Sequence, residues 1–332
     1  MTADLIHGGA LEAMRAAYPS APEPWIDLST GINPWPYPNT DLSSDAFVRL
    51  PSHAAYQTCR GAMSSAINVS PDVLLLAPGS ELLIRLLPTI VQARRVAVLA
   101  PSYEDHARVW PHHGAETLHT SDPLAMADEV DVVVVTHPNN PDGRTFRRAE
   151  LEAARQRLAV RSGWLIVDEA YGDLAPAESC ASLAGADSLI VLRSFGKFYG
   201  LAGLRLGAML GPQSALKIMQ EQLGVWPVSG AALEIGARAY ADTDWQHETR
   251  QQLALARARL DGILARAGLT TDGGTDLFRY VAVSNAHSLF DRLARAGVYV
   301  RRFEGSDTHL RIGLPADKDS EERLRAALSL SA

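Results

Sequence analysis

Short apolar runs alternate with amphipathic stretches through the middle of this chain, and this alternation constrains the fold more than any other feature. Each run is apolar at odd and even positions alike, as strands are when both faces of their sheet are covered. Such alternation predicts an α/β fold with a mainly parallel sheet. The expected strands are 73–76, 96–99, 132–136, 164–168, 188–193 and 206–210, and the expected helices are 81–91, 103–110, 148–161 and 213–222.

The pattern changes after Pro227, where helices and short strands follow without regular alternation. This change predicts a smaller C-terminal α+β domain. The first residues are rich in Pro and Gly, which favours an extended arm. We therefore expect an arm over 1–45, a large domain over 46–241 and a small domain over 242–332. The helices expected in the last part are 231–241, 245–267, 286–295 and 318–330, and the strands are 278–283, 298–301 and 309–312.

Charge and hydropathy argue against several classes of protein. The chain has 31 Lys and Arg against 38 Asp and Glu, and nucleic-acid binding needs a basic face, so we expect no nucleic-acid partner. It lacks both a long apolar run and a secretory signal, so we expect no membrane association. Two cysteines, Cys59 and Cys180, are too few for a disulfide scaffold and favour a cytoplasmic location. His106, His112 and His113 match no usual ligand spacing, so no metal site is expected.

Polar and glycine-rich segments follow the ends of the expected strands, where open α/β sheets bind ligands. Pro78-Gly79-Ser80-Glu81 opens a helix, an arrangement that suits a phosphate group. Asp168 ends another strand, and a buried carboxylate there needs a cationic partner. The chain has three lysines, and only Lys197 lies in an aromatic, glycine-rich setting. A helix cap, an ion pair or a surface lysine explains each feature alone, but their order together is specific.

Three segments resemble the pyridoxal-phosphate (PLP) enzymes of fold type I, in the branch of the class I and II aminotransferases. They are Asn140-Pro141-Asp142-Gly143, Asp168-Glu169-Ala170-Tyr171 and the run 194–207 around Lys197. The resemblance covers nearly the whole chain, and the third segment is the most specific. It implies a large, mainly parallel PLP-binding domain, a smaller C-terminal domain, pyridoxal 5'-phosphate as cofactor and a homodimer whose sites use residues of both subunits.

The resemblance also implies a role for each residue that matches a family motif. Lys197 holds the cofactor covalently, and Asp168 keeps the pyridine nitrogen protonated so that the ring can act as an electron sink. Tyr171 contacts the phenolic oxygen, and these three are the expected catalytic residues. The expected cofactor residues are Gly79, Ser80, Glu81 through its backbone, Tyr103 as the stacking ring, Asn140, Asp168, Tyr171, Ser194, Lys197 and Arg205.

Arginines in the C-terminal part indicate an anionic substrate. In the family that the chain resembles, the arginine at the position of Arg311 clamps the substrate α-carboxylate as a bidentate fork. Alternation along the strand that contains Arg301 and Arg302 places one of them inward, and the family pattern favours Arg301. A second arginine in the pocket suits a substrate with a second anion.

The N-terminal segments narrow the choice of substrate. Ile6-His7-Gly8-Gly9 and Leu28-Ser29-Thr30-Gly31-Ile32-Asn33-Pro34 resemble the opening of the L-threonine-O-3-phosphate decarboxylases of cobalamin biosynthesis, whose arm folds over the active site and contacts the substrate phosphate. The resemblance implies PLP-dependent decarboxylation of L-threonine O-3-phosphate to (R)-1-amino-2-propanol O-2-phosphate. The expected substrate residues are His7, Gly8, Gly9, Gly31, Asn33, Asn140, Arg301 and Arg311.

Three other interpretations stay open. A histidinol-phosphate-type aminotransferase shares every expected cofactor residue, although such enzymes usually have Tyr-Pro where this chain has Leu50-Pro51, with Tyr56 nearby as a substitute. A non-catalytic PLP-fold module is disfavoured by the intact Lys197, Asp168 and Arg311. A dinucleotide-binding enzyme is disfavoured because no G-x-G-x-x-G motif follows the first expected strand. The residues alone decide neither between decarboxylation and transamination nor which group returns a proton to Cα.

Overall fold

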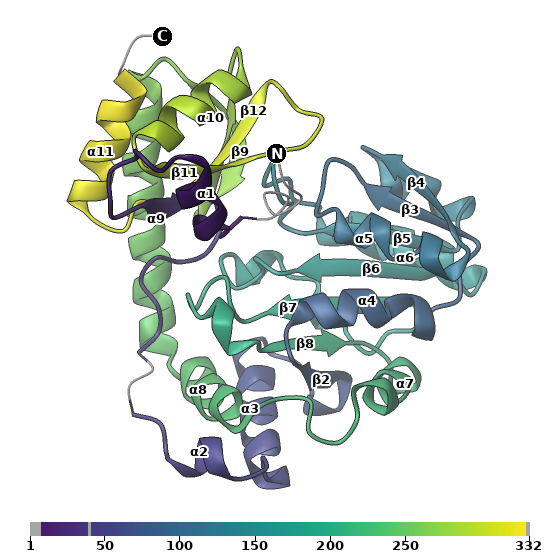
Figure 1. Ribbon diagram of the computed structural model, residues 1–332. Helices are drawn as coiled ribbons and strands as arrows, with labels where there is room; N and C mark the ends of the chain where they lie inside the picture. The colour runs from purple at the N-terminus through teal and green to yellow at the C-terminus, as the bar shows by residue number, and fades with distance from the viewer. Residues whose placement is uncertain (1–7, 39–40, 330–332) are drawn as a thin grey trace. The chain divides into compact units, whose positions relative to one another are not determined.

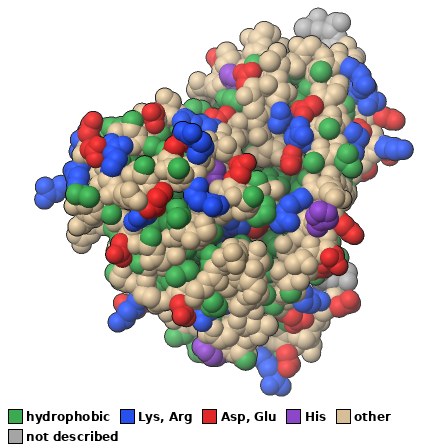
Figure 2. Space-filling model, turned by 180° about the vertical axis from the view of Figure 1, so that it is seen from behind, with side chains coloured by type: hydrophobic (Ala, Val, Ile, Leu, Met, Phe, Trp, Pro, Cys, Tyr) green, Lys and Arg blue, Asp and Glu red, His purple; other side chains and the backbone are tan. Residues whose placement is uncertain are grey.

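The computed structural model describes residues 8–38 and 41–329, and the chain divides into two compact units (Figure 1). Unit 1 comprises Met1–Trp35, Pro141–Gly143 and His247–Ala332, and unit 2 comprises Pro36–Asn140 and Arg144–Gln246. Each unit has a sheet of its own. Within the described ranges, no helix is both long enough and apolar enough to cross a membrane. Figure 2 shows basic and acidic side chains interspersed over the face that it displays.

Unit 2 is built on a seven-stranded sheet of order β2-β8-β7-β6-β5-β3-β4. Strands β7, β6, β5, β3 and β4 run parallel to one another, whereas β8 runs antiparallel to both β2 and β7. The expected mainly parallel sheet is therefore confirmed. Its strands are β2 (Leu74–Ala77), β3 (Arg95–Leu99), β4 (Glu116–Thr120), β5 (Val132–Thr136), β6 (Trp164–Glu169), β7 (Leu189–Ser194) and β8 (Gly207–Leu210).

Both faces of this sheet are covered, which explains why its central strands are apolar at both parities. On one face, Val134, Ile166 and Leu192 share a core with Leu83 of α4 and Leu216 of α7. The intervening strand residues are buried as well. The helices of unit 2 are α2 (Asp45–Val48), α3 (His53–Ala66), α4 (Ser80–Ile90), α5 (Asp105–Arg108), α6 (Arg148–Val160), α7 (Gln213–Leu223) and α8 (Gly230–Ala241).

Unit 1 is built on a five-stranded sheet of order β1-β11-β12-β10-β9. Strand β1 runs parallel to β11, and the other neighbours are antiparallel. The strands are β1 (Ile26–Leu28), β9 (Thr270–Thr275), β10 (Phe278–Ala282), β11 (Val298–Arg302) and β12 (His309–Gly313). The helices are α1 (Leu11–Ala17), α9 (Thr243–Arg266, in unit 1 from His247), α10 (Ala286–Arg295) and α11 (Lys318–Ser329).

The N-terminal segment is more regular than its Pro and Gly content suggests. It contains the helix α1, which its Pro and Gly content did not predict. Its strand β1 pairs with β11, with Asp27 opposite Tyr299. This pairing satisfies backbone groups that an isolated extended arm leaves to water.

Candidate active site

The register of the large sheet aligns the strand ends at which the cofactor residues are expected. Thr136 of β5 lies opposite Asp168 of β6. Ser194 of β7 lies opposite Gly207 of β8, which in turn lies opposite Ala77 of β2. The segments that hold Gly79, Asn140, Tyr171 and Lys197 all leave the sheet at this one edge. Tyr171 is buried, and Asn140 and Lys197 are partly buried.

The start of α4 forms an anion cradle with Arg205. Gly79 caps the helix with φ +86°, a conformation that favours glycine. A Cβ atom at Gly79 would lie 2.8 Å from Arg205 Nη2, and one at Gly207 would lie 2.8 Å from the Ser80 backbone nitrogen. Backbone N–H groups at a helix N-terminus beside a guanidinium suit a phosphate group.

The carboxylate of Asp168 is buried and held from two sides. His106 Nε2 lies 2.8 Å from Asp168 Oδ2, and the Ala170 N–H donates to Oδ1 at 3.0 Å. His106 is itself buried, and its Nδ1 has no hydrogen-bond partner among the described residues. Sequence reasoning gave His106 no role. The sequence feature that could have indicated a role for His106 is its position three residues after Tyr103, in a short helix that follows β3.

Tyr103 and Glu81 are joined by their side chains. The Tyr103 hydroxyl donates to Glu81 Oε2 at 2.9 Å. Burial, with Glu81 and Asp105 adding to it, raises the pKa of Tyr103. The Tyr103 ring stands edge-on to His106, with centroids 6.1 Å apart. The Glu81 side chain is thus shared between Tyr103 and Arg85, whose Nη2 lies 2.8 Å from Glu81 Oε1, so the group of Glu81 that can bind an anion is its backbone N–H.

A buried ionic cluster joins the ends of β6 and β7. Arg193 donates to Glu169 Oε2 at 2.8 Å and to Asp173, and Ser179 donates to the same Glu169 oxygen at 2.5 Å. All four side chains are buried. Because Glu169 follows Asp168 and Arg193 precedes Ser194, this cluster fixes the two strand ends that carry expected cofactor residues.

One face of the small sheet carries two arginines side by side. Arg301 of β11 lies directly opposite Arg311 of β12, so both belong to one face. The Arg311 guanidinium lies 5.0 Å from the Phe278 ring centroid, and that of Arg301 lies 5.4 Å from the centroid of Phe303. Arg302 packs instead against Phe290. Like charges at opposite positions are unfavourable unless an anion joins them.

The N-terminal segment lies against the same arginine. Arg311 Nη2 donates to the Ser29 carbonyl at 2.6 Å, and the Gly9 N–H donates to Ser29 Oγ at 2.8 Å. Asn33 is buried, and its Oδ1 accepts the Trp35 N–H. Gly31 is buried as well. His7 lies outside the described residues.

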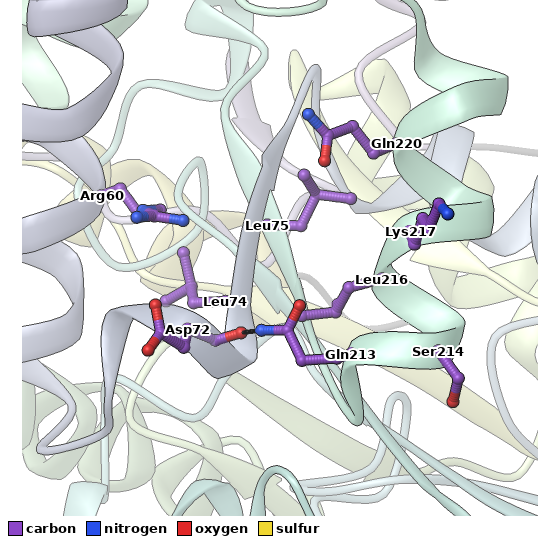
Figure 3. Close-up of a pocket in the computed structure, with 9 residues that line it drawn as sticks. All are labelled: Arg60, Asp72, Leu74, Leu75, Gln213, Ser214, Leu216, Lys217 and Gln220. Atoms are coloured by element: carbon purple, nitrogen blue, oxygen red, sulfur yellow. Dashed lines mark hydrogen bonds between the residues drawn. The ribbon is translucent and has the colours of Figure 1, made fainter.

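A cavity of about 370 Å³ lies away from the expected cofactor residues, at the opposite end of β2 from Gly79 (Figure 3). Arg60, Leu75 and Lys217 are among the residues that line it.

Tyr56 was considered as a substitute for the tyrosine that histidinol-phosphate aminotransferases have at the position of Leu50. Its hydroxyl accepts the Leu76 N–H at 3.0 Å.

Comparison with known proteins identifies the family. The model of the aminotransferase class I and II family matches residues 52–330. The threonine-phosphate decarboxylase of Pseudomonas aeruginosa is 40% identical over 98% of this chain and 97% of its own length. The histidinol-phosphate aminotransferase of Symbiobacterium thermophilum is 31% identical over 79% of this chain and 78% of its own.

A solved structure supports the fold. The histidinol-phosphate aminotransferase of Sinorhizobium meliloti, in complex with pyridoxal-5'-phosphate, superposes with a TM-score of 0.82 at 21% identity, over 96% of this chain and 93% of that one. The expected fold type I architecture is confirmed. The chain belongs to the aminotransferase class I and II family.

Proposed function

We propose that this chain is a PLP-dependent carboxy-lyase that decarboxylates L-threonine O-3-phosphate to (R)-1-amino-2-propanol O-2-phosphate, a reaction of cobalamin biosynthesis. The observation that carries the proposal is the 40% identity to a threonine-phosphate decarboxylase over almost the full length of both chains. The histidinol-phosphate aminotransferase is less similar and is matched over a shorter part of the chain.

The residues present fit PLP. The start of α4 and Arg205 offer an anion cradle in which a side chain at Gly79 would collide with the guanidinium. Asp168 is a buried carboxylate, a group that needs a cationic partner such as a pyridinium. The residues that we assign to hold the cofactor are Gly79, Ser80, Glu81, Tyr103, Asn140, Asp168, Tyr171, Ser194, Lys197 and Arg205.

PLP, when bound, supplies an electron sink for the electron pair that the departing carboxylate leaves at Cα. Asp168 keeps the ring nitrogen protonated, and His106 holds the Asp168 carboxylate in place. Tyr171 and Asn140 would donate hydrogen bonds to the phenolic oxygen of the cofactor. In the net reaction the bond between Cα and the carboxyl carbon breaks, CO2 leaves, and a proton is added at Cα. We assign that proton transfer to the Lys197 amine.

The arginine face supports a substrate with two anionic groups. Arg311 binds the α-carboxylate, and Arg301 together with Gly8 and Gly9 of the N-terminal segment binds the phosphate. With PLP bound, fixing both ends of the substrate would decide which bond at Cα breaks, and so whether the substrate is decarboxylated or transaminated.

We also propose a homodimer, supported by apolar side chains that a single chain leaves exposed. They lie in and just after α2 and in the loop before α8. Helix α2 lies against the start of α8, since a Cβ at Gly230 would lie 2.5 Å from the Ala46 carbonyl oxygen. The exposed residues are Phe47, Val48, Leu50, Val225 and Trp226. Sedimentation velocity should give the mass of a dimer, and a monomer at micromolar concentration contradicts this part of the proposal.

The test of the activity is an assay of the holoenzyme with L-threonine O-3-phosphate in the absence of any 2-oxo acid. We expect formation of the amine phosphate, abolished by Lys197→Ala together with the visible absorbance of the bound cofactor. Lys217→Ala, at the cavity of Figure 3, is the matched control and should change neither. A strict requirement for 2-oxoglutarate identifies a histidinol-phosphate-type aminotransferase instead.

A further inference from the structure

We infer that Ser29 is a positioning residue that ties the Gly8-Gly9 segment, called the arm below, to the substrate-binding Arg311, so that one small residue supports the subsites for both anionic groups of the substrate. Ser29 is completely buried and follows β1 in unit 1. The inference rests on the proposed function for the identity of the two subsites, whereas the contacts that carry it lie within unit 1.

The hydroxyl of Ser29 holds the arm. Ser29 Oγ accepts the Gly9 N–H at 2.8 Å and donates to Asp27 Oδ1 at 2.6 Å. The Ser29 N–H donates to the same Asp27 oxygen at 2.9 Å. Asp27 accepts the hydroxyl proton and Oγ accepts from Gly9, and the Ser29 side chain also hydrogen-bonds with Tyr299 of β11. Gly9 has φ +87°, so its N–H is presented by a turn that favours glycine.

The carbonyl of Ser29 holds the arginine. It accepts from Arg311 Nη2 at 2.6 Å, and Arg311 is only 5% exposed. The other side of this carbonyl touches the arm, since a Cβ at Gly8 would lie 2.6 Å from the Ser29 oxygen. Only glycine at position 8 allows this close contact. A side chain there would push the Ser29 carbonyl oxygen, which accepts from Arg311, out of its position.

Substitutions can separate the role of the Ser29 hydroxyl from that of the Ser29 carbonyl. Ser29→Ala removes the hydroxyl and keeps the carbonyl, so it frees the arm and leaves the acceptor of Arg311. Gly8→Ala pushes on the carbonyl and disturbs both. The matched control is Thr275→Ala, which removes a hydroxyl that likewise accepts a backbone N–H in unit 1, that of Leu277 at 3.1 Å.

The experiment compares two ligands of the holoenzyme, L-threonine O-3-phosphate and L-threonine, by kinetics and by absorbance titration. We expect Ser29→Ala to raise the KM for the phosphorylated substrate about tenfold, from the loss of a buried hydrogen bond, and to change the Kd for L-threonine less than twofold. Gly8→Ala should weaken both ligands, and Thr275→Ala should weaken neither. Equal effects of Ser29→Ala on the two ligands, or no effect, overturn the inference.

Amide hydrogen exchange gives a readout that does not depend on turnover. We expect exchange at Gly9 to accelerate at least tenfold in Ser29→Ala and to stay unchanged in Thr275→Ala, with equal melting temperatures as a check on folding. Unchanged exchange at Gly9 contradicts the inference. If the wild type releases no CO2 from threonine phosphate, the proposed function fails, and the exchange result still decides whether Ser29 holds the arm.

Discussion

His106 Nε2 lies 2.8 Å from Asp168 Oδ2, and both side chains are almost completely buried. With the Ala170 N–H on the other oxygen, the carboxylate cannot turn without breaking a buried hydrogen bond. His106 therefore presents Asp168 in one fixed orientation, which is what a partner for a pyridinium nitrogen requires.

Replacing His106 by phenylalanine keeps a ring at that position and removes the hydrogen bond. Without this hydrogen bond the Asp168 carboxylate is free to turn away from the cofactor nitrogen, so we expect PLP to bind the apoenzyme roughly tenfold more weakly. Titration of the apoenzyme with PLP, followed by absorbance, measures this. His112→Phe, at an exposed histidine of the same region, is the control. Equal affinity of His106→Phe and the wild type would falsify the positioning role.

The buried cluster around Arg193 is predicted to be a major contributor to stability. Burial opposes the charge of Arg193, but Asp173 and Glu169 outweigh it and raise its pKa. Arg193→Met leaves the buried carboxylates of Glu169 and Asp173 without their cationic partner, which should lower the free energy of unfolding by about 3–5 kcal/mol. Arg147→Met breaks an exposed pair with Glu150 and should leave the free energy of unfolding nearly unchanged. Urea unfolding compares them, and similar losses for both variants contradict the prediction.

The arginine opposite Arg311 predicts an effect on substrate binding. Arg301→Gln should raise the KM for threonine phosphate at least tenfold, because it removes a charged partner of the phosphate. Arg302→Gln, on the other face of the sheet, should leave that KM unchanged. Steady-state kinetics compares the two variants, and a similar rise in KM for both counts against the assignment of Arg301.

The thiol of Cys59 should be unreactive in the folded protein. Burial raises its pKa to about 12, so almost none of it is thiolate at pH 8. Because the unfolded thiol ionises near pH 9.0 and the folded one does not, Cys59 contributes stability below that pH and loses it as the pH rises toward 12. Titration with a disulfide reagent at pH 8 should detect Cys59 only after unfolding in urea. Rapid reaction of the native protein at Cys59 excludes this account.

The strands of the large sheet were predictable because each one is apolar at both parities. The expected strand 132–136 coincides with β5, and each of the other expected strands differs from the observed bounds by one residue at one or both ends. Strand β4 was missed because it lies at the edge of the sheet and has one apolar residue, Leu118, among its five. Strand β9 was missed because it contains Gly273 and Gly274.

Those two glycines have a tertiary reason that no local pattern carries. A Cβ at Gly273 would lie 2.0 Å from the Asp142 carbonyl oxygen, and the Gly274 N–H donates to that same oxygen at 2.7 Å. The family motif that begins at Asn140 thus continues into a contact with β9. Resemblance to the family flagged the motif, but not the strand against which it packs.

Motif residues of the candidate site could be named from the sequence, whereas the residues that hold them could not. Asp168 and Arg311 stand in motifs that resemble those of known enzymes. Their partners, His106 and Ser29, are separated from them by 62 and 282 positions, and only the folded chain brings them together. The contact between Ser29 and the arm likewise depends on the parallel pairing of β1 with β11.

The most direct test of the account follows the carboxyl carbon of the substrate. The holoenzyme is given L-threonine O-3-phosphate labelled with ¹³C at the carboxyl group, with and without 2-oxoglutarate. The account predicts one labelled CO2 for each amine phosphate formed, at the same rate in both reactions. A labelled 2-oxo acid that retains its carboxyl group and forms only when 2-oxoglutarate is present would contradict it.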